Sequence, residues 1–168
     1  MLSQARIKHL FQRLNDELSQ LGEIGEIGLV GGAVMCLVYN ARESTKDVDA
    51  IFEPTETIRR LAEKIGKDEG LPPTWLNDGA KGFIHPGFGR EDVLSLSHLR
   101  VWAPEPKYML AMKCISARWD TSDKDDVIFL IKLLKIKKAK QVFDLIEGYY
   151  PKNQILSKTQ FFIEELFE

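Results

Sequence analysis

Hydrophobic positions at the start of the chain recur with helical spacing. Apolar side chains follow one another every three or four positions from Leu2 to Leu21, and Gly22 comes next. This period places apolar residues on one face of an α-helix, and glycine commonly ends a helix. Residues 24–30 then form a short, partly β-branched apolar run that breaks at Gly31-Gly32, and residues 33–39 are too apolar to be amphipathic. The pattern predicts a helix, then a strand, a tight glycine turn and a buried helix.

The rest of the chain alternates between strand-like and helix-like patterns. The spacing predicts a strand over residues 47–52, a helix over 55–67, a short helix within 75–83, strands over 93–96 and 99–103, and helices over 108–119, 127–134, 137–149 and 157–167. A polar hinge is expected over residues 120–126. This order indicates an α/β (α+β) fold with a helical C-terminal third. We expect a core over residues 1–134, which includes the N-terminal helix, and a helical extension over 135–168 packed on the same domain.

Composition narrows the class of protein. The 168 residues include 23 basic and 25 acidic side chains, a net charge of −2, which argues against a generic binder of phosphate backbones. The longest apolar stretch, residues 27–39, falls short of the ~20 residues that span a bilayer. The N-terminal segment lacks the continuous apolar core of a signal peptide. Two cysteines in apolar runs are expected to be core residues in a reducing compartment, so we expect a cytoplasmic protein without membrane contact.

Asp47-Val48-Asp49 is the feature most suggestive of chemistry. Side chains two apart on a strand share a face, so the two carboxylates are expected side by side. Like charges on a partly buried strand raise a pKa or require a cation, and paired aspartates can bridge two Mg²⁺ ions in phosphoryl-transfer sites. The same pair also occurs in turns and on exposed strands without any such role.

Residues around the aspartates could contact phosphate. The Gly31-Gly32 turn presents backbone N–H groups where a helix begins. Side chains before the aspartates offer hydroxyl and cationic contacts: Arg42, Ser44, Thr45 and Lys46. A glycine turn is also common between a strand and a helix without any binding role, and the polar run is typical of a solvated loop.

A single lysine in an apolar run and a cluster of five lysines stand out in the C-terminal half. Lys113 is the only charged residue in the apolar run of residues 109–115, where it either extends to solvent at the domain edge or points into a cleft that holds an anion. Five further lysines lie close together: Lys132, Lys135, Lys137, Lys138 and Lys140. Such a run is usually a solvated helix face, and it could also guide an RNA or a nucleotide phosphate.

Taken together, these motifs resemble a known superfamily. Gly31-Gly32 followed by Asp47-x-Asp49 is similar to the signature of the DNA polymerase beta-type nucleotidyltransferases. The finer features resemble its small branch related to AbiEii toxins: Arg42-x-x-Thr45-Lys46-Asp47-Val48-Asp49, Trp75-Leu76-Asn77-Asp78, and Leu110-Ala111-Met112-Lys113 followed by Arg118 and residues 123–126. The resemblance covers about residues 27–134 and implies a mixed β-sheet flanked by helices.

The resemblance also implies a role for each matching residue. Gly31 and Gly32 would hold a nucleoside triphosphate, and Asp47 and Asp49 would ligate Mg²⁺ in a two-metal site. Lys113 would neutralise phosphate charge, while Asp126, or Asp125 beside it, would close the site or position Arg118. The superfamily normally adds a third carboxylate from a later strand. Strands 93–96 and 99–103 contain none, so Asp92 is the best candidate, ahead of Glu91 and Asp78.

The expected function follows from these roles. A Mg²⁺-dependent nucleotidyltransferase would transfer a nucleoside monophosphate from a nucleoside triphosphate to a hydroxyl of a tRNA or a protein, within a toxin–antitoxin or defence system. A cognate toxin or antitoxin partner is therefore expected. Two alternatives stay open: a non-catalytic nucleotide-binding or antitoxin-like protein that grips a partner, and a polyphosphate sensor that binds nucleotide without releasing pyrophosphate.

Overall fold

A computed structural model describes residues 1–119 and 121–168, which form two compact units. The first unit comprises residues 1–82 and 90–104, and the second comprises residues 83–89 and 105–168. The expectation of a mixed α/β fold with a helical C-terminal part is confirmed. The helices from residue 106 onward pack on one another.

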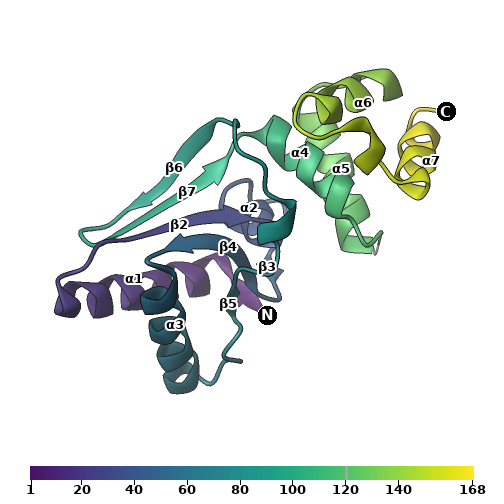
Figure 1. Ribbon diagram of the computed structural model, residues 1–168. Coiled ribbons are helices and arrows are strands. Elements are labelled where there is room, and N and C mark those ends of the chain that lie inside the picture. The colour runs from purple at the N-terminus through teal and green to yellow at the C-terminus, as the bar shows by residue number, and fades with distance from the viewer. Residues whose placement is uncertain (120) are drawn as a thin grey trace. The chain divides into compact units, whose positions relative to one another are not determined.

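The first unit holds every strand of the chain's described part (Figure 1). Its elements are β1 (Leu2–Ser3), α1 (Gln4–Leu21), β2 (Gly25–Val30), α2 (Gly32–Leu37), β3 (Ser44–Thr45), β4 (Val48–Glu53), α3 (Thr55–Glu69), β5 (Leu76–Asn77), β6 (Arg90–Ser95) and β7 (Leu99–Pro104). Gly22 ends α1 in the left-handed conformation, as the sequence pattern predicts.

Five of these strands form one mixed sheet in the order β5-β4-β2-β7-β6. The central strand β2 pairs antiparallel with β4 and parallel with β7, and β6 pairs antiparallel with β7. Parallel β4 and β5 are joined by helix α3, the kind of crossover that a parallel connection needs. The short strands β1 and β3 form a separate antiparallel pair.

One face of the sheet is apolar and is covered by α1 and α3. Val48, Ala50 and Phe52 of β4 are buried, in the alternation expected for a strand with one face in a core. Gly25 of β2 shows what covers that face, because a Cβ added to it would meet Leu18 of α1 and Ile58 of α3. Figure 1 shows both helices on the same side of the strands.

The other face, called here the aspartate face, is defined by the strand register. Asp49 of β4 lies opposite Val30 of β2 and Asn77 of β5. Two positions along β2, Gly28 lies opposite Trp102 of β7, and the indole ring crosses the site where a Cβ of Gly28 would be. Only glycine leaves room for that ring.

The short helix expected within residues 75–83 is wrong for residues 75–80. Residues 76–77 instead form β5, and a 3₁₀ helix over Lys81–Phe83 follows. The cause is tertiary: the buried Trp75 donates from Nε1 to the carbonyl of Ala62 in α3 at 2.8 Å, and its own carbonyl accepts from the Val48 amide at 2.7 Å. These two bonds hold the backbone extended along β4.

The second unit is helical. It contains α4 (Pro106–Ser116), α5 (Thr121–Leu133), α6 (Ala139–Glu147), a 3₁₀ helix over Lys152–Gln154 and α7 (Ser157–Leu166). The expected hinge over residues 120–126 is wrong for residues 121–126, which are the first turns of α5, and Asp120 lies outside the described residues. Among the described helices, none has the length and apolarity needed to cross a membrane.

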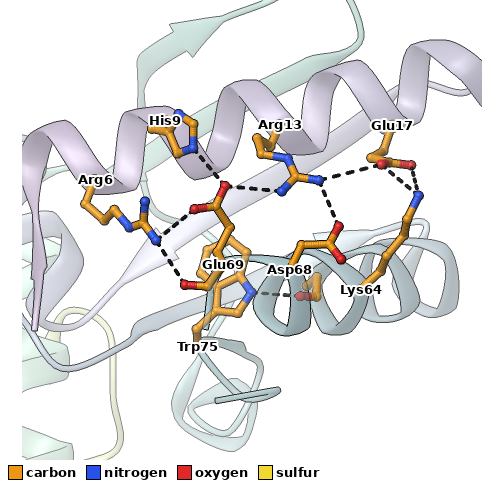
Figure 2. Close-up of polar contacts among 9 residues, drawn as sticks. Arg6, His9, Arg13, Glu17, Lys64, Asp68, Glu69 and Trp75 are labelled. Atoms are coloured by element: carbon orange, nitrogen blue, oxygen red, sulfur yellow. Dashed lines mark hydrogen bonds and ion pairs between the residues drawn. The ribbon is translucent and has the colours of Figure 1, made fainter. Parts of the chain in front are cut away.

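A polar network joins α1 to the C-terminal end of α3 (Figure 2). Glu69 accepts from Arg6 at 2.8 Å, from His9 at 2.9 Å and from Arg13 at 3.2 Å. Arg6 also donates to the main-chain carbonyl of Glu69, one of the carbonyls that a helix end leaves without an intrahelical partner. These contacts, with the His9 hydrogen bond as the largest cause, lower the pKa of Glu69 from 4.5 to about 2.

We expect Glu69→Gln to remove a pH-dependent part of the stability. Because the Glu69 pKa is lower in the folded than in the unfolded chain, its stabilisation is present above about pH 4.5 and is lost as the pH falls towards 2. The melting temperature of the variant should be lower than wild type at pH 7, and the difference should disappear between those two values. Glu63→Gln, an exposed position of the same helix, is the control. Equal effects of both substitutions would contradict the prediction.

Candidate functional site

The candidate site begins at the glycine turn after β2. Gly31 has φ +67° and ψ −148°, a combination that is almost restricted to glycine. A Cβ at this position would lie 2.9 Å from Oδ2 of Asp49. Two independent constraints, the backbone conformation and the approaching carboxylate, therefore require glycine here, and the predicted link between the turn and the aspartates is a direct contact.

Gly32, the first residue of α2, lies against Arg42 and Thr45. A Cβ at Gly32 would be 2.8 Å from Nη1 of Arg42 and 2.8 Å from Oγ1 of Thr45. Thr45 is buried, and its hydroxyl donates to the main-chain carbonyl of Asp47 at 3.2 Å. The glycine pair, the polar loop and the entry to β4 are therefore in contact at one place.

Arg42 supplies positive charge to this place. Its charge acts on the buried Cys36 thiol of α2, where burial raises the pKa and the guanidinium offsets part of that rise. Because α2 has only six residues, its dipole adds little, and the cationic character of the turn rests on the Arg42 side chain.

The aspartate pair lies where β4 begins. Asp47 directly precedes the strand, Asp49 is its second residue, and both are half-buried on either side of the buried Val48. Asn77 is a neighbour that the sequence analysis named within the motif Trp75-Leu76-Asn77-Asp78 but gave no role, because a two-residue strand gives no periodic signal. It lies opposite Asp49 on the aspartate face, and its Oδ1 accepts from the Gly79 amide at 3.1 Å.

The other residues expected around this site are placed less closely. Ser44 is half-buried and pairs through its backbone with Ser3, and Lys46 is exposed. Asp92 lies on the edge strand β6, three strands from β4, a separation of about 14 Å at ~4.8 Å per strand. Asp92 is therefore not positioned to complete the aspartate pair.

The two weaker candidates for a third carboxylate also have other surroundings. Asp78 forms an ion pair with Arg59 of α3 at 2.9 Å. Glu91 lies near Tyr39, where burial, with a contribution from the Glu91 charge, raises the pKa of the phenol to about 12.

Lys113 belongs to the second unit and is held by carboxylates of that unit. Its Nζ is 2.7 Å from Oδ2 of Asp126 and 3.2 Å from Oδ1 of Asp123, both on α5. The Lys113 side chain is 9% exposed and that of Asp126 3%, so this is a buried ion triad that joins α4 to α5. Asp123 also accepts from the Arg118 main-chain amide at 3.1 Å.

The aspartate pair fits a hard divalent cation. Mg²⁺ is commonly bound by one or two carboxylates together with phosphate oxygens of a substrate, rather than by an all-protein cage. Two half-buried carboxylates, Asp47 and Asp49, match that donor set. Among residues 1–119 and 121–168, no group of three His, Cys, Asp or Glu side chains is placed to hold a metal.

Comparisons of the chain with known protein families, curated proteins and solved structures found no match.

We expect Gly31→Ala to lower the free energy of unfolding by about 2–3 kcal/mol, because the new Cβ meets both backbone strain and Asp49. Gly22→Ala is the control: with φ +66° and ψ 23° it lies in the ordinary left-handed region, and nothing lies within 4 Å of the added atom, so about 1 kcal/mol is expected. Urea denaturation of both variants gives the comparison. A smaller loss at Gly31 than at Gly22 would show that Asp49 is not packed against the turn.

We also expect Lys113→Met to lower the free energy of unfolding by about 3–5 kcal/mol, because it leaves Asp126 buried without its cation. Lys107→Met, an exposed lysine on the same helix, should change it by no more than about 0.5 kcal/mol. Chemical denaturation in the absence of nucleotide is the measurement. An unchanged midpoint for Lys113→Met would instead show that the charge of Lys113 serves a ligand and not the fold.

Proposed function

We propose that the chain is a Mg²⁺-dependent nucleotidyltransferase that transfers a nucleoside monophosphate from a nucleoside triphosphate to an acceptor hydroxyl. The observation that supports this most is the contact between the glycine turn and Asp49, with Arg42 and Thr45 beside it. A triphosphate and its cation need three kinds of group. These are a glycine turn, a guanidinium and a pair of carboxylates that fit Mg²⁺.

Each residue of the candidate site has its own proposed role. Gly31 and Gly32 let Asp49, Arg42 and Thr45 lie close against the turn, because no Cβ separates these side chains from the backbone. Arg42 offsets phosphate charge, and Thr45 fixes the turn that carries Asp47. Asp47 and Asp49 would hold Mg²⁺, which when bound supplies charge neutralisation and orientation of the phosphates. The acceptor is proposed to be a tRNA or a protein, and the setting a toxin–antitoxin or defence system.

A second function is favoured by two specific observations. The described residues place no third carboxylate with Asp47 and Asp49, and Lys113 is already balanced by Asp123 and Asp126. Both would suit a protein that binds a nucleotide or a partner chain without transferring a phosphoryl group.

Binding of Mg²⁺ and nucleotide tests the site itself. We expect calorimetric titration with each nucleoside triphosphate and Mg²⁺ to show binding by wild type. The double variant Asp47→Asn, Asp49→Asn should bind at least about 100-fold more weakly, because both carboxylate charges are gone. Glu53→Gln, at the exposed end of the same strand, is the control and should bind as wild type. Equal affinity of the double variant and wild type would contradict the proposal.

Transfer is scored separately from binding. Incubation with α-labelled nucleotides, total tRNA and cell extract should give a labelled RNA or protein that the double aspartate variant does not make. Nucleotide binding without labelled product, in Mg²⁺ or Mn²⁺ and with the cognate partner present, would favour the non-catalytic function.

A further inference from the structure

A lysine-rich turn connects α5 to α6 in the second unit and is defined here as residues 132–140. These nine residues include five lysines and no acidic residue: Lys132, Lys135, Lys137, Lys138 and Lys140. All five are exposed. Lys140 forms an ion pair with Asp144 at 2.7 Å, and that hydrogen bond raises its pKa. In the described part of the chain, the other four have no ion pair with a carboxylate.

The turn is ordered by hydrogen bonds that do not use the lysine ammonium groups. Lys135 ends α5 in the left-handed conformation with φ +57°, and the Ile136 amide donates back to the carbonyl of Ile131 at 3.1 Å. The amides of Lys137 and Lys138 both donate to Oε1 of Gln141, at 2.8 and 3.0 Å. The lysines are therefore presented from a fixed backbone, which lowers the ordering cost of binding a ligand.

Two of the lysines, Lys137 and Lys138, do not serve the stability of α6. A helix N-terminus carries partial positive charge and favours acidic side chains, yet the first turn of α6 has none and is preceded by Lys137 and Lys138. Repulsion within the cluster adds to this cost. Helix stability therefore accounts for Lys132 in the last turn of α5 and for Lys140, which pairs with Asp144, but not for Lys137 and Lys138.

The amino-acid composition of the turn favours a phosphate-bearing polymer as its ligand. Lysine is depleted in protein–protein interfaces, whereas five of the nine residues 132–140 are lysines. Point charges on flexible stems suit phosphates, which need no bidentate geometry. The segment also contains no aromatic side chain for anchoring at a membrane interface.

We propose that the lysine-rich turn docks the phosphate backbone of a nucleic acid without reading its sequence. The net charge of −2 argues against phosphate binding over the whole surface but leaves room for a local site, because at physiological salt charges beyond about 8 Å are largely screened. The proposal rests on the second unit alone and stands whether or not the aspartate pair binds a nucleotide.

The test uses the full chain and a fluorescein-labelled oligouridine of about 20 nucleotides, longer than the ~4–16 nucleotides that a single-strand-binding fold covers. Fluorescence anisotropy over a salt series gives affinity and its salt dependence. Four neutralised phosphates predict a slope of about −3 for log affinity against log salt, from ~0.7 per phosphate. DNA of the same length should bind with a similar slope, since only the backbone is contacted.

The decisive variant is Lys135→Gln, Lys137→Gln, Lys138→Gln. We expect it to bind at least about tenfold more weakly at low salt, with the slope reduced in size by about 2. Its melting temperature should not fall by more than about 2 °C, because neutralising charge at the start of α6 is not destabilising. The matched control changes three exposed lysines of the same unit, Lys107→Gln, Lys152→Gln and Lys158→Gln, and should bind as wild type.

Three results would overturn the proposal. The first is that wild type leaves the oligouridine unbound at about 50 mM salt. The second is an equal loss in both triple variants, which would show a response to net charge and no local site. The third is binding to phosphatidylcholine vesicles that contain about 30% phosphatidylserine without binding to RNA or DNA, which would make the turn a membrane-surface site.

Discussion

The antiparallel register between β2 and β4 decides which face of the sheet joins the core and which carries the aspartate pair. Val30 lies opposite Asp49 and Leu29 opposite Ala50, so a slip of one residue would turn Asp49 towards α1 and α3 and expose Val48. Burial of an ionised carboxylate without a partner costs several kcal/mol, and loss of a buried valine adds more. The same register brings the end of β2, and with it Gly31, against Asp49. Fold and candidate site therefore depend on one pairing.

Buried and exposed charges have different roles in the two units. In the helical unit, Lys113 and Asp126 are almost wholly removed from water, so each needs the other to offset desolvation, and together they join α4 to α5. In the α/β unit, the charges that link α1 and α3 lie near the surface and contribute mainly through the hydrogen bonds that Glu69 accepts. The lysine-rich turn is a third case, because four of its ammonium groups have no ion-pair partner in the described residues and leave their charge available to a ligand.

Much of the fold could be predicted from local patterns. The apolar spacing that ends at Gly22 gave α1, and the alternation that ends before Pro54 gave β4, because a single face of each is buried. The glycine pair and Asp47-x-Asp49 were also expected to lie together, and the structure places Gly31 beside Asp49. β5 could not be predicted, because its extended backbone depends on the Trp75 contacts with Ala62 and Val48. The first turns of α5 could not be predicted either, since their acidic residues indicate a polar hinge until Lys113 is placed beside them.

The amino-acid sequence by itself determined the class of fold, the glycine turn and the identity of the candidate carboxylates, because these follow from periodicity and from the chemistry of adjacent residues. Only the tertiary structure decided the partners of each charge. In the structure, β6, which carries Asp92, lies three strands from β4, which carries Asp49. Lys113 forms ion pairs with Asp123 and Asp126, and Arg42 lies against Gly32. The physical reason is that charge pairing and close packing join residues that are far apart in the chain. Local sequence patterns do not indicate which distant residues will be in contact.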